Sequence, residues 1–132
     1  MKPVYQTKFG VPDGNCFNAC IASIIECSIG DLPDLCEIEA TGQNWLIGLN
    51  DALRPMGYGV ISSPASEENP ASIYIPKGCH FIASGIGPRG ARHSVVYLQR
   101  DDDVDAVMVH DPIGPKYRGL KKTTSIQLIV RL

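Results

Sequence analysis

The segment from Cys16 to about Cys27 is apolar over most of its length, with hydrophobic residues at helical spacing. The recurring positions are Phe17, Cys20, Ile21 and Ile24, and the clearly polar positions are Asn18, Ser23 and Glu26. A helix that is apolar on most of its surface is typical of the interior of a domain. The turn-forming sequence at 12–15 precedes it, with Asp13 or Asn15 as the expected cap. We therefore predict a buried helix that ends at Ser28-Ile29-Gly30.

A second helix is predicted from about Gly42 to Met56. Its apolar residues Trp45, Leu49, Leu53 and Met56 fall near one face, and Gly57 is a natural stop. Between the two helices, Asp31–Leu35 has a proline between two acidic residues and predicts a short turn or a single helical turn.

The second half of the chain has the composition of strands separated by turns. The predicted strands are Tyr58–Ser62, Ser72–Ile75, His80–Ser84, His93–Leu98, Asp105–His110 and Ser125–Val130. Helices followed by strands indicate an α+β fold, here a buried N-terminal helix packed on a mainly antiparallel sheet. The 132 residues fit a single domain, 1–132, with one hydrophobic core.

Charge and hydropathy exclude several classes of partner. A formal net charge of −2 gives no basic face for nucleic acid. No apolar run approaches the roughly 20 residues of a membrane span. The first residues lack the apolar stretch of a signal peptide, so we expect a cytoplasmic protein without a nucleic-acid or membrane partner.

Five cysteines need an interpretation that suits a reducing compartment. An odd number without a secretory signal argues against a disulfide framework. The chain has no C-x-x-C pair, and its three histidines are not spaced as zinc ligands usually are. We expect neither a metal ion nor an organic cofactor, which leaves thiol chemistry.

Cys16 is the best candidate for a reactive thiol. It occupies the first turn of the buried helix, directly after a tight turn, and the N-terminus of a helix stabilises a thiolate. The alternative is that Cys16 is only a small apolar residue. Cys20, Cys27 and Cys79 are expected in the core, whereas the sequence does not decide the role of Cys36.

Two predicted strands place a histidine and an aspartate near each other. Acidic residues 101–103 are the expected tip of a hairpin between the strand that starts at His93 and the strand that ends at His110. If this hairpin is symmetric about Asp102, His93 lies opposite Asp111, with Cβ atoms about 5 Å apart on one face. A carboxylate there can hold the imidazole in one tautomer. A one-residue slip brings His110 opposite His93 or turns Asp111 away. The alternative without catalysis is that His93 is only a histidine at the start of a strand and that Asp111-Pro112 is only a turn that ends one.

The chain carries three short motifs in a fixed order. They are Gly14-Asn15-Cys16-Phe17 leading into Ala19-Cys20-Ile21-Ala22-Ser23, then His93-Ser94-Val95-Val96, then His110-Asp111-Pro112-Ile113-Gly114. This arrangement resembles the papain-like cysteine peptidase superfamily, and within it the bacterial branch that includes double-glycine-leader peptidases and small phage and prophage proteins. In those families a cysteine opens the buried helix, a histidine begins a sheet strand, and an aspartate or asparagine follows on the next strand.

The resemblance implies a papain-like fold and a catalytic triad. Cys16 would be the nucleophile, His93 the general base and acid, and Asp111 the group that orients the histidine. The family's oxyanion donor is usually a glutamine a few residues before the cysteine. Gln6 lies ten residues upstream, and Asn15, directly before Cys16, is the competing donor.

These residues predict a cysteine-dependent hydrolase or acyl transferase of the peptidase or amidase type. Its substrate would be a peptide, a protein, or a small amide or thioester. Arg89, in the glycine-rich loop 85–90 before His93, is expected to bind a substrate carboxylate or phosphate, unless it is only a solvated loop residue. The alternative function is a catalytically silent papain-fold module, such as a phage-encoded one, that binds or inhibits another protein.

Overall fold

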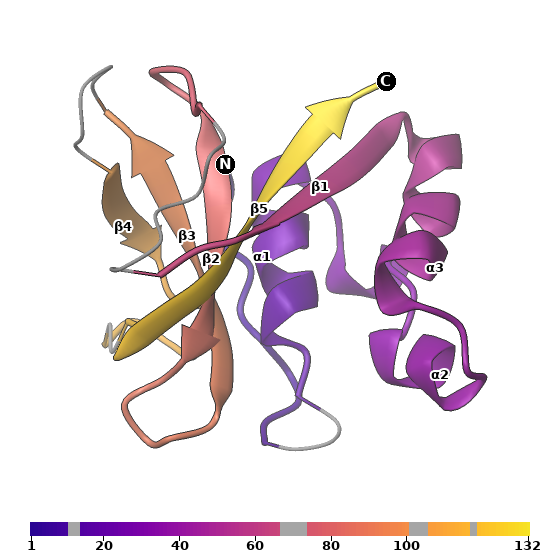
Figure 1. The fold of residues 1–132 in the computed structure, drawn as a ribbon, viewed down its shortest axis with the longest axis horizontal. Helices are drawn as coiled ribbons and strands as arrows, with labels where there is room; N and C mark the ends of the chain where they lie inside the picture. The colour runs from indigo at the N-terminus through magenta and orange to yellow at the C-terminus, as the bar shows by residue number, and fades with distance from the viewer. Residues whose placement is uncertain (11–13, 67–73, 101–105, 117–118) are drawn as a thin grey trace.

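The computed structural model of this chain describes residues 1–10, 14–66, 74–100, 106–116 and 119–132. Within them, five strands form one antiparallel sheet in the order β1-β5-β2-β3-β4 (Figure 1). They are β1 (Tyr58–Pro64), β2 (His80–Ile86), β3 (Arg92–Gln99), β4 (Ala106–His110) and β5 (Lys122–Arg131). The predicted α+β class and the antiparallel sheet are thus confirmed.

The helices precede the sheet in the chain, as predicted. They are α1 (Cys16–Ile25), α2 (Leu35–Ala40) and α3 (Trp45–Leu53), with short 3-10 turns η1 (Ile29–Asp31) and η2 (Arg54–Met56). Helix α1 packs on β2 and β3, and α3 packs on β1. In Figure 1, α1 stands between the twisted sheet and the α2–α3 pair. The Phe17 ring of α1 meets the Trp45 ring of α3 edge-on, with centroids 5.6 Å apart.

Helix α1 is buried, as its apolar sequence predicts. Ala19, Cys20, Ile21 and Ala22 are 0% exposed, and Ile21 belongs to a core cluster with Ile82 and Val96 of the sheet. The polar side chains within the helix bind backbone carbonyls. Asn18 donates to Pro33, and Ser23 donates to Ala19 one turn earlier. The helix therefore lies in the interior without leaving these donors unpaired.

Helix α1 begins at Cys16 as predicted, but its end and its N-terminal capping differ from the prediction. The helix ends at Ile25, earlier than expected, because Glu26 adopts a left-handed conformation with φ 59° and donates its N–H to the Ala22 carbonyl. Asn15 occupies the N-cap position but makes no side-chain cap bond. Its amide oxygen instead accepts from the N–H groups of Thr7 and Lys8, 3.0 Å away in each case. Asp13, the other predicted cap, lies outside the described residues.

The region between α1 and β1 is more helical than predicted. Residues 29–31 form η1, and α2 follows the predicted turn at Asp31–Leu35, in a stretch for which the sequence predicted no helix. The sequence signal for α2 is its N-cap residue Asp34, whose carboxylate accepts from the N–H groups of Cys36 and Glu37. The second predicted helix starts at Trp45 rather than near Gly42, since Asn44 caps it there.

Five of the six predicted strands are present, and most of them are longer than predicted. The strand predicted at Ser72–Ile75 is wrong for its described part, because Tyr74 and Ile75 belong to no strand; residues 72–73 lie outside the described residues. Pro76 follows directly and has no N–H to extend a ladder. Position 105, the predicted start of the fifth predicted strand, also lies outside the described residues.

The register of the β3–β4 hairpin is not the predicted one. Leu98 pairs with Val107, whereas the predicted symmetry would have paired it with Ala106. The adjacent residues Val96 and Tyr97 then pair with His110 and Met108, which are two positions apart. This irregularity, typical of a β-bulge, moves the register by one further residue. Direct pairing of His93 with Asp111 was therefore a wrong prediction.

Candidate active site

The turn before α1 places Cys16 at the start of the helix. The Gly14 N–H donates to the Gly10 carbonyl at 2.7 Å, and a Cβ added at Gly14 would lie 2.7 Å from the same oxygen. Only glycine fits such a close approach of two backbone segments. Ala19 is the first residue of α1 to donate within the helix, to Asn15. Cys16 therefore lies among the N-terminal N–H groups of the helix and is itself half-buried.

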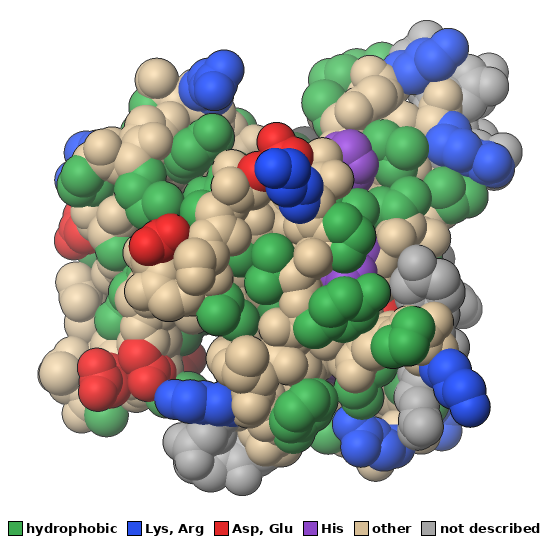
Figure 2. Space-filling view, turned by 180° about the vertical axis from the view of Figure 1, so that it is seen from behind, with side chains coloured by type: hydrophobic (Ala, Val, Ile, Leu, Met, Phe, Trp, Pro, Cys, Tyr) green, Lys and Arg blue, Asp and Glu red, His purple; other side chains and the backbone are tan. Residues whose placement is uncertain are grey.

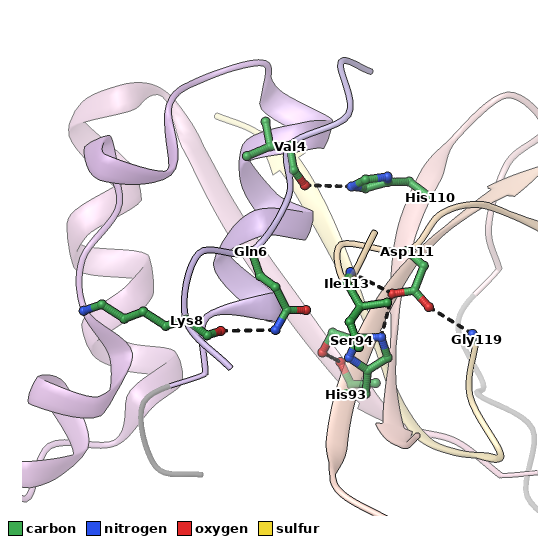
Figure 3. A network of polar contacts seen from close by, with 10 residues as sticks. Val4, Gln6, Lys8, His93, Ser94, His110, Asp111, Ile113 and Gly119 are labelled. Carbon is green, nitrogen blue, oxygen red and sulfur yellow. Dashed lines mark hydrogen bonds and ion pairs between the residues drawn. The ribbon is translucent and has the colours of Figure 1, made fainter. Parts of the chain in front are cut away.

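His93 and Asp111 form a close pair although they are not direct cross-strand partners. His93 is the second residue of β3, and Asp111 directly follows β4. Together the two register displacements shift the pairing by two residues from the predicted one. A shift by an even number keeps a side chain on the same face, so Asp111 faces the same side of the sheet as His93. The Nε2 of His93 lies 2.7 Å from the Asp111 Oδ1 (Figure 3), and the side chains are 10% and 0% exposed.

Backbone N–H groups fix the Asp111 carboxylate from the other side. Its Oδ1 accepts from Ile113 at 3.1 Å, and its Oδ2 accepts from Gly119 at 2.9 Å (Figure 3). Burial alone raises the pKa of Asp111, but hydrogen bonds from His93 and from these N–H groups outweigh it and hold the pKa below its ordinary value. Sequence reasoning missed both backbone donors, since no side-chain pattern marks them.

His93 bridges Asp111 and Cys16. Burial alone lowers the pKa of His93, but hydrogen bonds to Asp111 and to Cys16, together with the charges of both, outweigh it and raise the pKa from 6.5 to about 9. The imidazole therefore stays protonated at neutral pH in this arrangement. Since Asp111 occupies Nε2, the other ring nitrogen, Nδ1, is the one left for Cys16. The structure thus brings the three predicted catalytic residues together.

The other cysteines differ from Cys16 in their surroundings. Cys20 is fully buried, and burial, together with the charges of Cys16 and Asp111, raises the pKa of its thiol. Its predicted place in the core is confirmed. Cys27 is half-buried and packs against the core cluster, whereas Cys79 is half-buried and is not part of that cluster, so only the placement of Cys79 in the core was wrong. Cys36 is half-buried on α2.

The two predicted oxyanion donors both contact the N-terminal segment. The Nε2 of Gln6 donates to the Lys8 carbonyl at 3.1 Å, and the Nδ2 of Asn15 donates to the Thr7 hydroxyl at 2.9 Å. Gln6 lies near the aspartate end of the triad, because its backbone N–H donates to Pro112, next to Asp111, whereas Asn15 directly precedes Cys16. Figure 3 shows the Gln6 side chain between Lys8 and the His93–Asp111 pair. Each amide keeps a second N–H that the Lys8 or Thr7 bond does not use.

Arg89 lies near His93. It is exposed on the β2–β3 turn and lines a small hollow of about 30 Å³ together with Arg92, His93 and Ile113. Gly87 contributes the space, since an added Cβ there would lie 3.2 Å from the Cβ of His93. Two arginine side chains therefore flank the histidine on the sheet side of the site.

His110 has a structural place outside the triad. It is 1% exposed, and its Nε2 donates to the Val4 carbonyl at 2.7 Å (Figure 3). The Tyr5 ring meets it edge-on, with centroids 5.0 Å apart. His110 therefore ties β4 to the N-terminal segment, which the sequence pattern did not indicate.

Within the described residues, no group of three or more His, Cys, Asp or Glu side chains is arranged to hold a metal ion. In the same part of the chain, no helix has the length and apolar character needed to cross a bilayer. The chain matches no protein-family model, no curated protein and no solved structure. The chemistry of the site must therefore be inferred from its own geometry.

Proposed function

We propose that this chain is a papain-like cysteine-dependent hydrolase or acyl transferase of the peptidase or amidase type. The observation that carries the proposal is the position of His93, which is bound to Asp111 at 2.7 Å and lies close enough to Cys16 for that residue to raise the pKa of the imidazole. A histidine held by a carboxylate and placed against a thiol is the arrangement of nucleophilic catalysis. The order of the three residues in the chain agrees with the papain-like superfamily.

The proposed reaction proceeds through an acylated cysteine. The Cys16 sulfur attacks the substrate carbonyl carbon, and the π electrons move to the oxygen, where N–H groups at the start of α1 can stabilise the charge. The bond to the leaving group then breaks, and the His93 imidazolium gives its proton to that amine, alcohol or thiol. Water attacks the thioester, His93 accepts its proton, and the thiolate is released. An amine in place of water gives acyl transfer.

Asp111 orients His93 and stabilises its protonated form in this scheme, while Gln6 or Asn15 supplies a further oxyanion donor. The exposed guanidinium of Arg89 is placed for a carboxylate or phosphate on the substrate. The substrate class is a peptide, a protein, or a small amide or thioester.

A second candidate is a catalytically silent module with the same fold that binds or inhibits another protein. The observation that favours it concerns the oxyanion donors, since the Gln6 amide donates to Lys8 and the Asn15 amide donates to Thr7. A site whose donors serve the N-terminal segment can bind a partner without turning it over.

Reaction with p-nitrophenyl acetate separates the two candidates. We expect mass spectrometry to find an acetyl group on Cys16, followed by its hydrolysis at a rate that falls in His93→Gln. The Cys16→Ala variant should release nitrophenol no faster than buffer. Acetylation of Cys16 that is no faster than that of Cys36 or Cys79 would contradict the enzyme proposal and favour the binding module.

A further inference from the structure

Basic side chains gather at one end of the sheet, where the β2–β3 turn and the start of β5 lie together (Figure 1). Arg92 of β3 pairs with Ile86 of β2, and Ile86 pairs with Lys122 of β5, so the three side chains form one row on one face. The backbones of Arg92 and Lys122 are two strand spacings, about 10 Å, apart. The N–H of Lys121 donates to the Ile86 carbonyl, and Arg89 lies in the turn. We call Arg89, Arg92, Lys121 and Lys122 the basic end.

The positive charge of the basic end is not neutralised by the described part of the chain. All four side chains are exposed, and none of them forms an ion pair with a described carboxylate. Asp111 is 0% exposed and is bound to His93. Its negative charge is therefore matched within the candidate triad. The basic end is a local excess of cations that faces solvent and attracts anions.

The formal net charge of −2 does not reveal this excess, because acidic side chains elsewhere offset it. Most of the described acidic residues belong to the helices or to their ends, namely Glu26, Asp31, Asp34, Glu37, Glu39 and Asp51. In Figure 2, Asp and Glu side chains lie mainly on the side of the helices, whereas Lys and Arg side chains mark the lower edge on the side of the sheet. An anionic partner is therefore steered toward the sheet end of the molecule.

The size and position of the basic end favour a short acidic stretch of protein. An extended chain rises about 3.3 Å per residue, so three or four residues span the row from Arg92 to Lys122. Guanidinium groups bind carboxylates with two parallel hydrogen bonds, and the basic end has two of them. A long nucleic acid fits less well, because a polyanion that extends beyond the sheet meets the carboxylates of the helices.

We infer that the basic end binds a run of three or four acidic residues in a protein partner. The carboxylates of the run contact Arg92 and Lys122, and its chain passes over Ile86. Arg89 and Arg92 also line the hollow that includes His93, so the bound run leads to the candidate active site. Binding does not require turnover at Cys16. The inference therefore goes beyond the proposed function and applies equally to a substrate of the enzyme and to a target of the binding module.

Titration of the ¹⁵N-labelled chain with N-acetyl-hexaglutamate amide tests the inference, with the hexaglutamine peptide as the uncharged reference. We expect hexaglutamate to shift the backbone amide signals of residues 86, 87, 89–92 and 121–123. At low ionic strength it should bind at least about tenfold more tightly than hexaglutamine. Most of this advantage should disappear at about 1 M salt, where the Debye length is about 3 Å.

Two double variants locate the binding. Lys121→Gln with Lys122→Gln should weaken the binding of hexaglutamate by about threefold or more. Lys2→Gln with Lys77→Gln is the matched control, because it removes the same charge from two exposed lysines outside the basic end. Lys77 precedes β2 and Ile86 ends it, so this control lies at the opposite end of that strand. Its affinity for hexaglutamate should stay close to that of the wild type.

Equal affinities of the wild type for hexaglutamate and hexaglutamine overturn the inference, as do equal losses in the two double variants. A thymidine hexanucleotide that binds more tightly than hexaglutamate also overturns it, since the basic end would then be a nucleic-acid site. The readout is binding alone. If p-nitrophenyl acetate fails to acetylate Cys16 while hexaglutamate still binds the basic end, the proposed enzyme fails and the inference stands.

Discussion

Replacement of Asp111 by asparagine is the perturbation that tests the candidate triad most directly. Asparagine has the same shape, but its single carbonyl oxygen cannot replace both carboxylate oxygens. Asp111 accepts from His93 and Ile113 on one oxygen and from Gly119 on the other. In Asp111→Asn an NH₂ group faces one of these donors, which we expect to cost about 1–3 kcal/mol of folding free energy.

The larger effect is on the charge of His93. Raising its pKa from 6.5 to about 9 corresponds to about 3 kcal/mol of preference for the imidazolium. Burial opposes this shift, the hydrogen bond to Asp111 is the largest cause that raises the pKa, and Cys16 and the charge of Asp111 add to it. Without the carboxylate, the pKa of His93 must fall. The thiolate of Cys16 then loses most of the cation that stabilises it.

The assay is the rate of Cys16 alkylation by iodoacetamide between pH 5 and pH 10. In the wild type, an imidazolium that persists to about pH 9 should stabilise the Cys16 thiolate, so that alkylation is already faster at pH 6.5 than that of an ordinary thiol. In Asp111→Asn the rate at pH 6.5 should be at least about tenfold lower and should rise with pH as for an ordinary thiol.

His110→Gln is the matched control. His110 is the neighbour of Asp111 and is equally buried, and its replacement disturbs the bond to Val4 without touching the triad. We expect it to lower stability while the pH profile of alkylation stays that of the wild type. If Asp111→Asn, still folded by circular dichroism, keeps the wild-type profile, the assigned role of Asp111 is refuted.

Three further predictions concern the same site and its turn. Substoichiometric iodoacetamide should label Cys16 before the other four cysteines, and peptide mapping that finds another cysteine first would contradict this. The raised pKa of His93 should stabilise the fold by up to about 3 kcal/mol below pH 6.5, and this contribution should vanish as the pH rises through about 9. Urea unfolding of the wild type and His93→Gln at pH 6 and pH 10 measures it, and a difference independent of pH disproves it. Gly14→Ala should lose about 1–3 kcal/mol in denaturant titration, because its Cβ lies 2.7 Å from the Gly10 carbonyl oxygen; Gly30→Ala, with 3.7 Å to the nearest atom, should be neutral.

The features that the sequence predicted well are those governed by burial. Helix α1 begins at Cys16 as predicted, because a helix buried on most sides must be apolar at most positions. Helix α2 was missed because six residues are too few for a clear hydrophobic period, although the Asp34 cap was readable. The strand predicted at Ser72–Ile75 shows the reverse error, in which a short apolar run was assigned to a sheet that does not include its described residues.

The contact of His93 with Asp111 was predicted from a register that the structure does not have. A displacement of one residue turns a side chain to the other face, and the register differs from the prediction once in the pairing of Leu98 with Val107 and once at the irregularity beside Tyr97. Two such displacements return Asp111 to the face of the sheet that His93 occupies. The alternation of hydrophobic residues can therefore indicate which face of the sheet a residue occupies. It does not reveal the β-bulge, because no sequence pattern marks the irregularity between Val96 and Tyr97.

The placement of the site depends on the N-terminal segment as much as on the sheet. The Val4 N–H donates to Ser23 of α1 at 2.9 Å, and its carbonyl accepts from His110 of β4 at 2.7 Å. Two residues later, the Gln6 N–H donates to Pro112, directly after Asp111. One extended segment thus joins the helix that carries the nucleophile to the strand end that carries the acid. The distance between Cys16 and the His93–Asp111 pair is therefore set by backbone bonds that leave no mark in the hydrophobic pattern, which is why the sequence predicts the members of the site but not what fixes their spacing.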